Sequence, residues 1–373
     1  MPDARSESLD FLIKKSDWKQ TRFVSGAVPE ALEPGRVLFR VDRFALTANN
    51  ITYALAGDGL GYWRFFPAEE GWGRIPVMGF GDVLRSTHAG VAEGTRCFGF
   101  FPMSRYLVIQ PSRASREQIV DGAPHRAGLA PVYGQYTPVL GDPLYSAAHE
   151  DAHMLMRGLF LTSFLVEDFL GEHDFFGARA VLISSASSKT SIALAFQVSR
   201  MGRARAIGLT SPRNLDFVKG LGYYDEVLCY DEVASLPADS PSVFVDMAGN
   251  GDVVRAIHTH FGAALKHSCT VGVTHWEAPR AAADLPGPKP EFFFAPTQIQ
   301  KRSKDWGADG FQQRVGDAWR AFRGASAAWL HVVRASGRDA LERVYQDTLA
   351  GRARPQDGHV LTLWDASRAS DHR

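Results

Sequence analysis

A serine-rich turn is the part of this sequence best suited to binding a phosphorylated ligand. The turn spans residues 184–191 and follows a short apolar segment, residues 179–184. Ser185, Ser188 and Ser191 have the spacing at which glycines occur in a dinucleotide-binding turn, where the backbone must approach a pyrophosphate closely. Serine is also small, and its hydroxyl can donate a hydrogen bond to phosphate. We therefore expect a diphosphate site here; a loop that only caps the next helix is the alternative.

Further donors accompany these three serines. Ser187, Lys189 and Thr190 lie in the same turn, and Lys189 adds a positive charge. The helix expected to begin beside Ser191 directs the positive end of its dipole at the same place. Tyr230, at the end of a later apolar segment, is also expected to contribute to the cofactor site.

The end of the next apolar segment predicts which cofactor binds. It carries Thr210, Ser211 and Arg213, roughly 20 residues beyond the serine-rich turn, as in a dinucleotide-binding unit. An NAD site would place Asp or Glu here to bond the ribose hydroxyls, whereas a hydroxyl and a fixed cation match a 2′-phosphate. The sequence therefore predicts NADPH rather than NADH. The alternative is that Ser211 caps the following helix and Arg213 is a solvated surface charge.

Alternating strands and helices must position these residues. Strands are expected at residues 179–184, 204–210, 226–230, 242–247 and 267–273, and helices at residues 153–170, 191–200, 214–221 and 253–261. Such alternation predicts crossover connections and a doubly wound parallel sheet, the Rossmann architecture.

The flanking segments predict a second, β-rich domain. Strands are expected at residues 37–46, 75–84, 94–101 and 105–111, and near the C-terminus a helix at 338–349 precedes a strand at 358–364. Short strands divided by turns favour a small barrel, and the last strand is expected to rejoin it. The predicted domains are residues 1–150 (first part of the barrel domain), 151–295 (nucleotide-binding domain) and 296–373 (return to the barrel domain).

Composition excludes several classes of protein. The 373 residues contain 41 Lys and Arg against 41 Asp and Glu, and this zero net charge disfavours nucleic-acid binding. The three cysteines form no close pair, which disfavours a disulfide framework or a Cys-rich zinc site. Residues 1–19 lack the apolar core of a signal peptide, and charges interrupt the apolar segment 154–170. We expect a cytoplasmic protein with neither a nucleic-acid nor a membrane partner.

Five short segments carry a resemblance to a known superfamily. They lie at residues 46–53, 76–81, 94–99, 221–227 and 243–249, and they are similar to the motifs L-N-P-x-D-Y, P-x-x-x-G-x-E, G-D-R-V-x-G, L-G-A-D-x-V and D-V-V-F-D-x-x-G. In this order they resemble the medium-chain dehydrogenase/reductase superfamily, in its zinc-independent quinone-reductase and enoyl-reductase branch. The resemblance covers nearly the whole chain and implies a Rossmann domain plus a GroES-like barrel domain. It departs from the superfamily in lacking the glycines of the phosphate turn and the Cys and Glu ligands of the zinc branch, so no metal site is expected.

The resemblance also implies candidate catalytic residues. In enoyl-thioester reductases a tyrosine beyond the Asn segment serves as the acid; Tyr62 is the loose positional match here, and Tyr53 is the other choice. Asn49 and Thr52 match positions that could orient the nicotinamide or the substrate. A packed barrel aromatic, or a loop polar group, would account equally well for each of these residues.

The resemblance implies an NADPH-dependent, zinc-independent reductase of an activated C=C bond (enoyl or enone) or of a carbonyl. The aromatic insert, residues 59–72, suggests an apolar or acyl substrate, and Lys301 with Arg302 either contacts a phosphate or forms a solvated cluster. A homodimer is expected through residues 267–273 and the following Thr274–Trp276. The alternative function is that of a catalytically inactive, reductase-like protein that binds a nucleotide or a partner.

Overall fold

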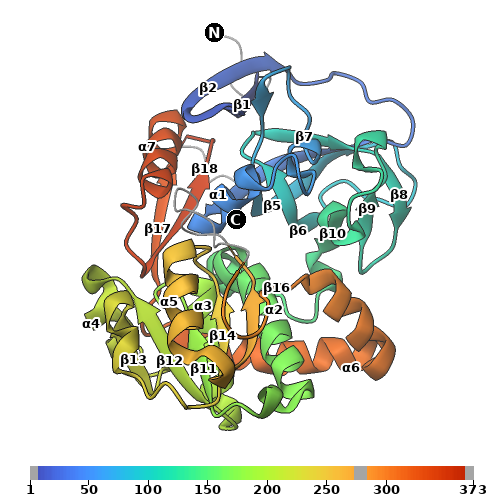
Figure 1. Ribbon diagram of the computed structural model, residues 1–373. Coiled ribbons are helices and arrows are strands. Elements are labelled where there is room, and N and C mark those ends of the chain that lie inside the picture. Colours follow the sequence, from blue (N-terminus) through green and yellow to red (C-terminus); the bar gives the residue numbers. More distant parts are fainter. Residues whose placement is uncertain (1–6, 273–283, 366–373) are drawn as a thin grey trace. The chain divides into compact units, whose positions relative to one another are not determined.

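The computed structural model describes residues 7–272 and 284–365, and its internal contacts divide the chain into two units (Figure 1). Unit 1 comprises Met1–Leu155 and Leu330–Arg373, and unit 2 comprises Met156–Trp329. The segment 296–329, expected from the sequence to return to the barrel domain, belongs to unit 2 instead, because its long helix packs on other helices of that unit. Thr274–Trp276, predicted to form part of a dimer contact, lies outside the described residues.

Unit 1 contains the expected barrel-like sheet. Its strands follow the order β17-β18-β3-β5-β6-β10-β9-β8, and β7 pairs with β3. Their bounds are β3 Val37–Leu46, β5 Pro76–Ser86, β6 Arg96–Pro102, β7 Tyr106–Ile109, β8 Pro111–Ala114, β9 Ile119–Asp121, β10 Gln135–Pro138, β17 His331–Ser336 and β18 Asp357–Thr362. The C-terminal strand β18 pairs antiparallel with β3, with Val360 opposite Ala45. The predicted return of the last strand to the first domain is therefore confirmed.

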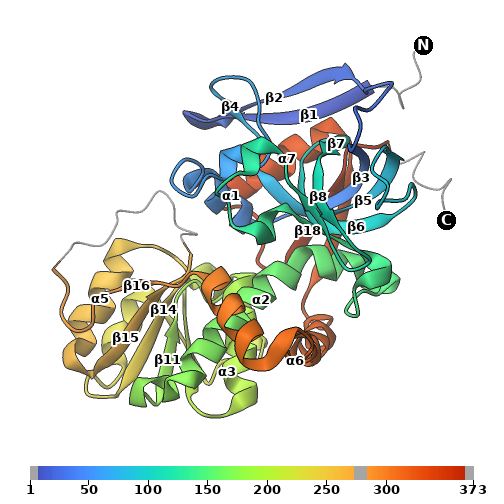
Figure 2. The same ribbon diagram turned by 90° about the vertical axis from the view of Figure 1, so that its right-hand side faces the viewer.

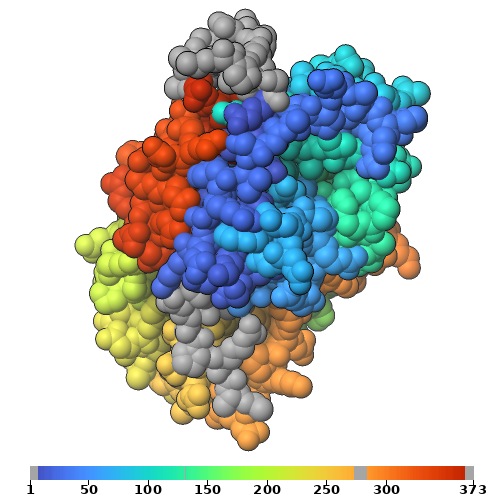
Figure 3. All heavy atoms as spheres, turned by 90° about the horizontal axis from the view of Figure 1, so that it is seen from above, coloured from blue at the N-terminus to red at the C-terminus, as the bar shows by residue number. Residues whose placement is uncertain are grey.

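An N-terminal hairpin, which the sequence did not predict, adds a second small sheet to unit 1. It consists of β1 (Glu7–Lys14) and β2 (Asp17–Ala27), and β1 also pairs with the two-residue strand β4 (Trp72–Gly73). Helix α7 (Arg338–Leu349) lies beside this hairpin (Figures 1 and 3): Tyr345 donates a hydrogen bond to the carbonyl of Trp18 and packs its ring against Phe11. The hairpin was missed because its mixed charges conceal a short apolar face that only α7 and the barrel bury.

Unit 2 is a parallel sheet with helices on both faces (Figure 2). The strand order is β13-β12-β11-β14-β15-β16, and every described pair is parallel. The bounds are β11 Ala180–Ile183, β12 Arg205–Thr210, β13 Glu226–Cys229, β14 Ser242–Asp246, β15 Leu265–Thr270 and β16 Glu291–Phe292; the helices are α2 Glu150–Glu172, which begins in unit 1, α3 Lys189–Met201, α4 Leu215–Gly220, α5 Gly251–Phe261 and α6 Ala295–Ser326. The predicted doubly wound sheet is confirmed.

Alternating residues of the central strands fill two separate cores. In β11, Val181 and Ile183 pack with residues of α2 and α3, whereas Ala180 and Leu182 pack with residues of α5. Successive side chains of a strand point to opposite faces, so an uninterrupted apolar strand can be covered by helices on both sides. The carboxyl ends of β11 and β12 thereby come to one edge of the sheet, where a ligand binds in folds of this architecture.

Among the described residues, no helix has both the length and the apolar character needed to cross a lipid bilayer.

Candidate functional site

The serine-rich turn connects β11 to α3 and is held by its own hydroxyls. The side chain of Ser188 caps α3 by accepting a hydrogen bond from the Ser191 amide at 3.2 Å, and its Oγ donates to the Ser191 Oγ at 2.8 Å. The Ser191 hydroxyl in turn donates to the Ser184 carbonyl at 2.9 Å. Two of the three serines at glycine-like positions therefore use their hydroxyls inside the turn, as the helix-cap alternative anticipated.

Ser185 occupies the glycine-like position in backbone conformation as well as in spacing. Its φ is +51°, in the left-handed region that favours glycine. Its amide donates a hydrogen bond to the Tyr230 hydroxyl at 3.0 Å, so two predicted site residues are in contact. Burial raises the pKa of Tyr230 to about 12, and its phenol is therefore neutral at physiological pH.

The buried carboxylate of Asp246, which was not selected from the sequence, joins this turn to the neighbouring strand β14. Ser184 donates from Oγ to Asp246 Oδ1 at 2.7 Å and accepts a hydrogen bond from the Met247 amide at 2.8 Å. Asp246 also accepts from the Gly249 amide at 3.1 Å. Sheet pairing explains this contact: β11 and β14 are neighbours with Ile183 opposite Val245, so the residues that follow the two strands, Ser184 and Asp246, must meet.

The other polar side chains at the edge of the turn are half-buried. Ser187, Lys189 and Thr190 lie at the beginning of α3, whose first turn contains no acidic residue. A negatively charged ligand would therefore meet a helix dipole that no acidic residue of that turn neutralises. Asn214 donates from Nδ2 to the Ser187 Oγ at 3.0 Å and links the turn to the loop after β12.

The loop after β12 places the predicted 2′-phosphate residues in different environments. Thr210 is buried, Ser211 is half-buried and Arg213 is exposed on a 3-10 turn, Pro212–Asn214. Ser211 stands at the N-terminus of that turn without a capping side-chain hydrogen bond. The helix-cap explanation of Ser211 therefore does not apply, and the hydroxyl stays a candidate for contact with a ligand.

Lys301 and Arg302 both form ion pairs with acidic residues, but they differ in exposure. Arg302 is buried, and its guanidinium contacts Asp168 at 2.6 Å and Glu172 at 3.0 Å, both on α2. Lys301 pairs with Glu172 as well. These charges join α6 to α2. The expected solvated cluster therefore describes Lys301, which is exposed, but not Arg302, which is buried.

In unit 1, helix α1 (Ala48–Leu55) carries three of the predicted catalytic residues. Asn49 donates from Nδ2 to the Tyr53 hydroxyl at 2.9 Å, and Thr52 is half-buried on the same helix. The neighbouring Asn50 is buried and donates to the Pro76 carbonyl at 2.9 Å, which attaches α1 to the start of β5. The helix is therefore held at a defined place on the barrel, with Asn49 and Tyr53 one turn apart.

Tyr62, the other predicted acid, lies in an aromatic cluster together with Tyr53. The two ring centroids are 4.7 Å apart, and Phe65 and Phe100 pack in the same cluster. The Tyr62 hydroxyl is 3.1 Å from the hydroxyl of Tyr133, which the sequence analysis had not considered as an acid. Burial raises the pKa of Tyr53 and of Tyr62 well above the ordinary value for tyrosine. These phenols are therefore neutral hydrogen-bond donors rather than bases.

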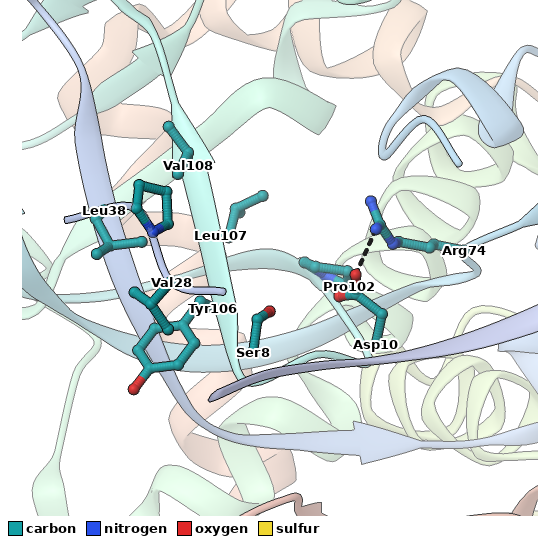
Figure 4. A pocket seen from close by; sticks show the side chains of 10 residues that line it. Ser8, Asp10, Val28, Leu38, Arg74, Pro102, Tyr106, Leu107 and Val108 are labelled. Atoms are coloured by element: carbon teal, nitrogen blue, oxygen red, sulfur yellow. Dashed lines mark hydrogen bonds and ion pairs between the residues drawn. The ribbon is translucent and has the colours of Figure 1, made fainter. Parts of the chain in front are cut away.

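A separate cavity of about 260 Å³ lies in unit 1 and includes none of the predicted site residues (Figure 4). Its lining residues are Ser8, Asp10, Val28, Pro29, Leu38, Arg74, Pro102, Tyr106, Leu107 and Val108. At one end Arg74 and Asp10 form an ion pair of 2.5 Å, and most of the remaining wall is apolar. This cavity belongs to the space between the N-terminal hairpin and the barrel.

No group of three or more His, Cys, Asp or Glu residues within 7–272 and 284–365 is placed to hold a metal ion. His149 and His153 are four positions apart in the sequence, a spacing at which two histidines can bind one metal ion. In the structure each of them contacts other groups instead. The Nδ1 of His149 lies 2.9 Å from the Ser146 hydroxyl, and the ring of His153 packs against Phe98 with a centroid distance of 4.3 Å.

Comparison with solved structures identifies the fold. CurA from Vibrio vulnificus in complex with NADPH is 14% identical, with a TM-score of 0.61 and 96% of this chain and 99% of that chain covered. The yhdH oxidoreductase from Salmonella enterica in complex with NADP is 13% identical, with a TM-score of 0.54 and coverages of 95% and 99%. A mutant form of enoyl thioester reductase from Candida tropicalis is 12% identical, with a TM-score of 0.54 and coverages of 95% and 99%.

These similarities confirm the expected architecture of a medium-chain dehydrogenase/reductase, with a Rossmann domain and a GroES-like domain. At such low identity they establish the fold alone. A comparison with curated protein sequences finds no significant match. The family model DUF2855, described as "Protein of unknown function", matches residues 44–354. The chain therefore belongs to the DUF2855 family, on a medium-chain dehydrogenase/reductase fold.

Proposed function

We propose that this protein is an NADPH-dependent oxidoreductase that reduces an activated C=C bond (enoyl or enone) or a carbonyl without zinc. The observation that carries the proposal is the serine-rich turn at the carboxyl edge of the parallel sheet, where Ser185 has a left-handed φ at the position of a glycine. Support also comes from similar structures crystallised with NADPH or NADP. The absence of the Cys and Glu ligands of the zinc branch supports the zinc-free reaction.

The shape of the turn supports the proposal that it binds a dinucleotide. Its tight bend is made by the left-handed backbone of Ser185 and by the internal hydrogen bonds of Ser188 and Ser191. Serines therefore form a bend that glycines usually form. The half-buried Lys189 and Thr190 then supply a cation and donors beside the positive end of α3. We assign diphosphate binding to Ser187, Lys189 and Thr190, and the shape of the turn to the other serines and Tyr230.

Selection of NADPH over NADH is assigned to the loop after β12. Ser211 and Arg213 supply a hydroxyl and a guanidinium where an NAD site would carry an acidic residue. Thr210 is buried at the end of the strand, directly before this loop. When bound, NADPH supplies a hydride. The chain itself binds the substrate and donates a hydrogen bond or a proton to the substrate oxygen. We assign both roles to the cluster around Tyr53 and Tyr62, together with Asn49 and Thr52.

Fluorescence titration tests the proposal, because the chain contains eight tryptophans whose emission can report cofactor binding. Wild-type protein is expected to bind NADPH with a micromolar dissociation constant. Arg213→Ala should weaken NADPH by about 10- to 100-fold, the cost of losing a charge-assisted hydrogen bond, and should leave NADH nearly unchanged. Equal weakening of both cofactors would contradict the assignment of Arg213. The matched control is Arg205→Ala, which removes an exposed guanidinium at the opposite end of β12.

One observation favours a second candidate function, that of an inactive reductase-like binding protein. The hydroxyls of Ser188 and Ser191 are engaged within the turn, and serine side chains occupy positions that glycines leave open. Absence of NADPH binding at millimolar concentration would favour this candidate over the reductase.

Two further properties complete the proposal. We propose a homodimer formed through the edge of the parallel sheet. That edge is β16 rather than the expected strand at residues 267–273, which β16 flanks; Phe292 is exposed in β16 and Phe294 just after it. We also propose a cytoplasmic location, in keeping with three cysteines that are all free and buried. Sedimentation of wild-type protein against a Phe292→Glu variant tests the dimer: the variant should sediment as a monomer.

A further inference from the structure

We infer that Tyr133, rather than the buried Tyr62, is the phenol that donates a proton to the substrate oxygen, and that Tyr62 holds it in position. This inference rests on the proposed reductase function and names the acid of that reaction. Tyr133 belongs to a 3-10 turn, Pro131–Gly134, which follows β9 in the sequence of unit 1. It was not among the residues selected from the sequence.

Exposure distinguishes the two hydrogen-bonded phenols. The Tyr62 side chain is buried, with 7% of its surface exposed, and it packs on the rings of Tyr53 and Phe65 at centroid distances of 4.7 and 5.1 Å. Tyr133 packs on the rings of Phe65 and Phe100 in the same cluster but is only half-buried. A proton donor must reach the substrate to within hydrogen-bond distance. Of these two phenols, Tyr133 is therefore the one that a substrate can contact.

The hydrogen bond between the phenols assigns their roles. The two hydroxyl oxygens are 3.1 Å apart, so each O–H can donate to the other. If the buried Tyr62 donates to Tyr133, the Tyr133 proton is available to a ligand, and the Tyr62 O–H stabilises the phenolate that forms when this proton leaves. Burial raises the pKa of Tyr133, and the hydrogen bond from Tyr62 acts in the opposite direction.

The backbone of Tyr133 is fixed by a buried ion pair. Arg126 donates from Nη1 to the Tyr133 carbonyl at 3.0 Å and from Nε to Asp121 at 2.6 Å. Both members of this pair are buried, and Asp121 also accepts the amides of Gln110 and Ala123 at 3.1 Å each. A donor on a rigid, fully hydrogen-bonded support loses little entropy when it meets the substrate.

The proposed step balances in atoms and electrons. Once an enone has accepted a hydride from bound NADPH at its β-carbon, the C=C pair forms a double bond between the α-carbon and the carbonyl carbon. The π pair of the C=O bond then resides on the oxygen, as an enolate. That oxygen takes the proton of Tyr133 as the phenolic O–H bond breaks, which yields an enol and a phenolate. Water returns a proton to the phenolate, and the enol tautomerises to the saturated ketone.

The first test needs neither the cofactor nor turnover. Protein labelled with ¹³C at the tyrosine Cζ gives one signal for each of the ten tyrosines, and Tyr133→Phe, Tyr62→Phe and Tyr53→Phe assign three of them. Cofactor-free wild-type protein is then titrated with 2-cyclohexen-1-one. We expect the Tyr133 signal to shift most. A larger shift at Tyr53 or Tyr62, or no shift at Tyr133 up to saturation of the solution, would overturn the inference.

The second test compares variants in NADPH oxidation with the same enone. Tyr133→Phe should lower kcat by about 100-fold or more, Tyr62→Phe by about 10-fold and Tyr53→Phe by less, because only the first removes the donated proton. Tyr223→Phe, in unit 2, is the matched control and should retain wild-type kcat. The NADPH dissociation constant should be unchanged in all four variants.

The two proposals fail in different ways. If wild-type protein does not bind NADPH, the proposed function falls, while the NMR titration still decides whether Tyr133 meets the enone. If NADPH binds and is oxidised but Tyr62→Phe or Tyr53→Phe costs more than Tyr133→Phe, only the assignment of Tyr133 falls.

Discussion

The serine-rich turn of unit 2 and the tyrosine cluster of unit 1 achieve order in different ways. In the turn, residues close in sequence hold one another through short side chains, as Ser188 and Ser191 do. In the cluster, the hydroxyls of Tyr62 and Tyr133 meet although 71 positions separate them in the sequence. A site built from local hydrogen bonds can be located from spacing, whereas one built from packed rings needs the barrel to bring its parts together.

The largest expected effect concerns the support of the tyrosine cluster. Asp121→Ala would leave the Arg126 guanidinium buried without its partner, and breaking such a pair costs about 3–5 kcal/mol of unfolding free energy. Urea unfolding should show this loss. Asp58→Ala, in an exposed loop of the same unit, is the control and should change stability by less than about 0.5 kcal/mol. A small effect of Asp121→Ala would mean that packed rings alone hold the cluster.

A pH titration sharpens the contrast between the two units. Burial, aided by the neighbouring Asp168, raises the pKa of Glu167 on α2 to about 7. The folded state thus binds this proton more tightly than the unfolded state does, so stability should fall as pH rises from about 4.5 to about 7. Glu167→Gln should remove up to about 3 kcal/mol of this fall.

Comparison of urea midpoints for wild type and Glu167→Gln at pH 5 and pH 8 measures this effect. The two proteins should differ little at pH 5, and the variant should be more stable at pH 8. Equal midpoints at pH 8 would show that the ionised Glu167 carboxylate does not destabilise the folded state, and would contradict the prediction. The tyrosine cluster should contribute nothing over this range, since burial raises the pKa of Tyr53 and of Tyr62.

The anchor of the serine-rich turn should have the next largest effect. Asp246→Ala removes the acceptor of the Ser184 hydroxyl and of the Gly249 amide in a buried place, at a cost of about 2 kcal/mol. Hydrogen exchange should show lost protection at the ends of β11 and β14. Asp239→Ala, in an exposed loop of the same unit, should leave that protection intact. Unaltered exchange in Asp246→Ala would show that the serines hold the turn alone.

The smallest expected effect is a gain. Ser185→Gly should stabilise the protein by about 0.5–1 kcal/mol, because glycine adopts the left-handed φ of +51° without strain. Ser187→Gly, two positions further on, has no such strain to relieve and loses the hydrogen bond from Asn214, so it should lower the stability instead. The midpoint of thermal unfolding measures both. Destabilisation by Ser185→Gly would show that the serine side chain contributes more than its backbone strain costs.

Much of the fold could be predicted from the sequence. Residues 37–46 and 338–349 form a strand and a helix with the predicted bounds, because apolar period and end signals agree there. The hairpin Glu7–Ala27 and the long helix Ala295–Ser326 were not predicted, because their apolar faces are short or interrupted by charge and become evident only against α7 and α2. The ion pair of Arg302 with Asp168 could not be predicted either, because it forms only where α6 packs on α2.

The sequence by itself determined the alternation of strands and helices in the parallel sheet, the position of the serine-rich turn and the missing acidic residue after β12, because each depends on neighbours in the chain. Only the tertiary structure decided that Ser185 is left-handed, that Asp246 anchors the turn and that Tyr133 meets Tyr62. These contacts join segments far apart in the sequence, and their formation depends on sheet register and on the packing of rings, which no local pattern encodes.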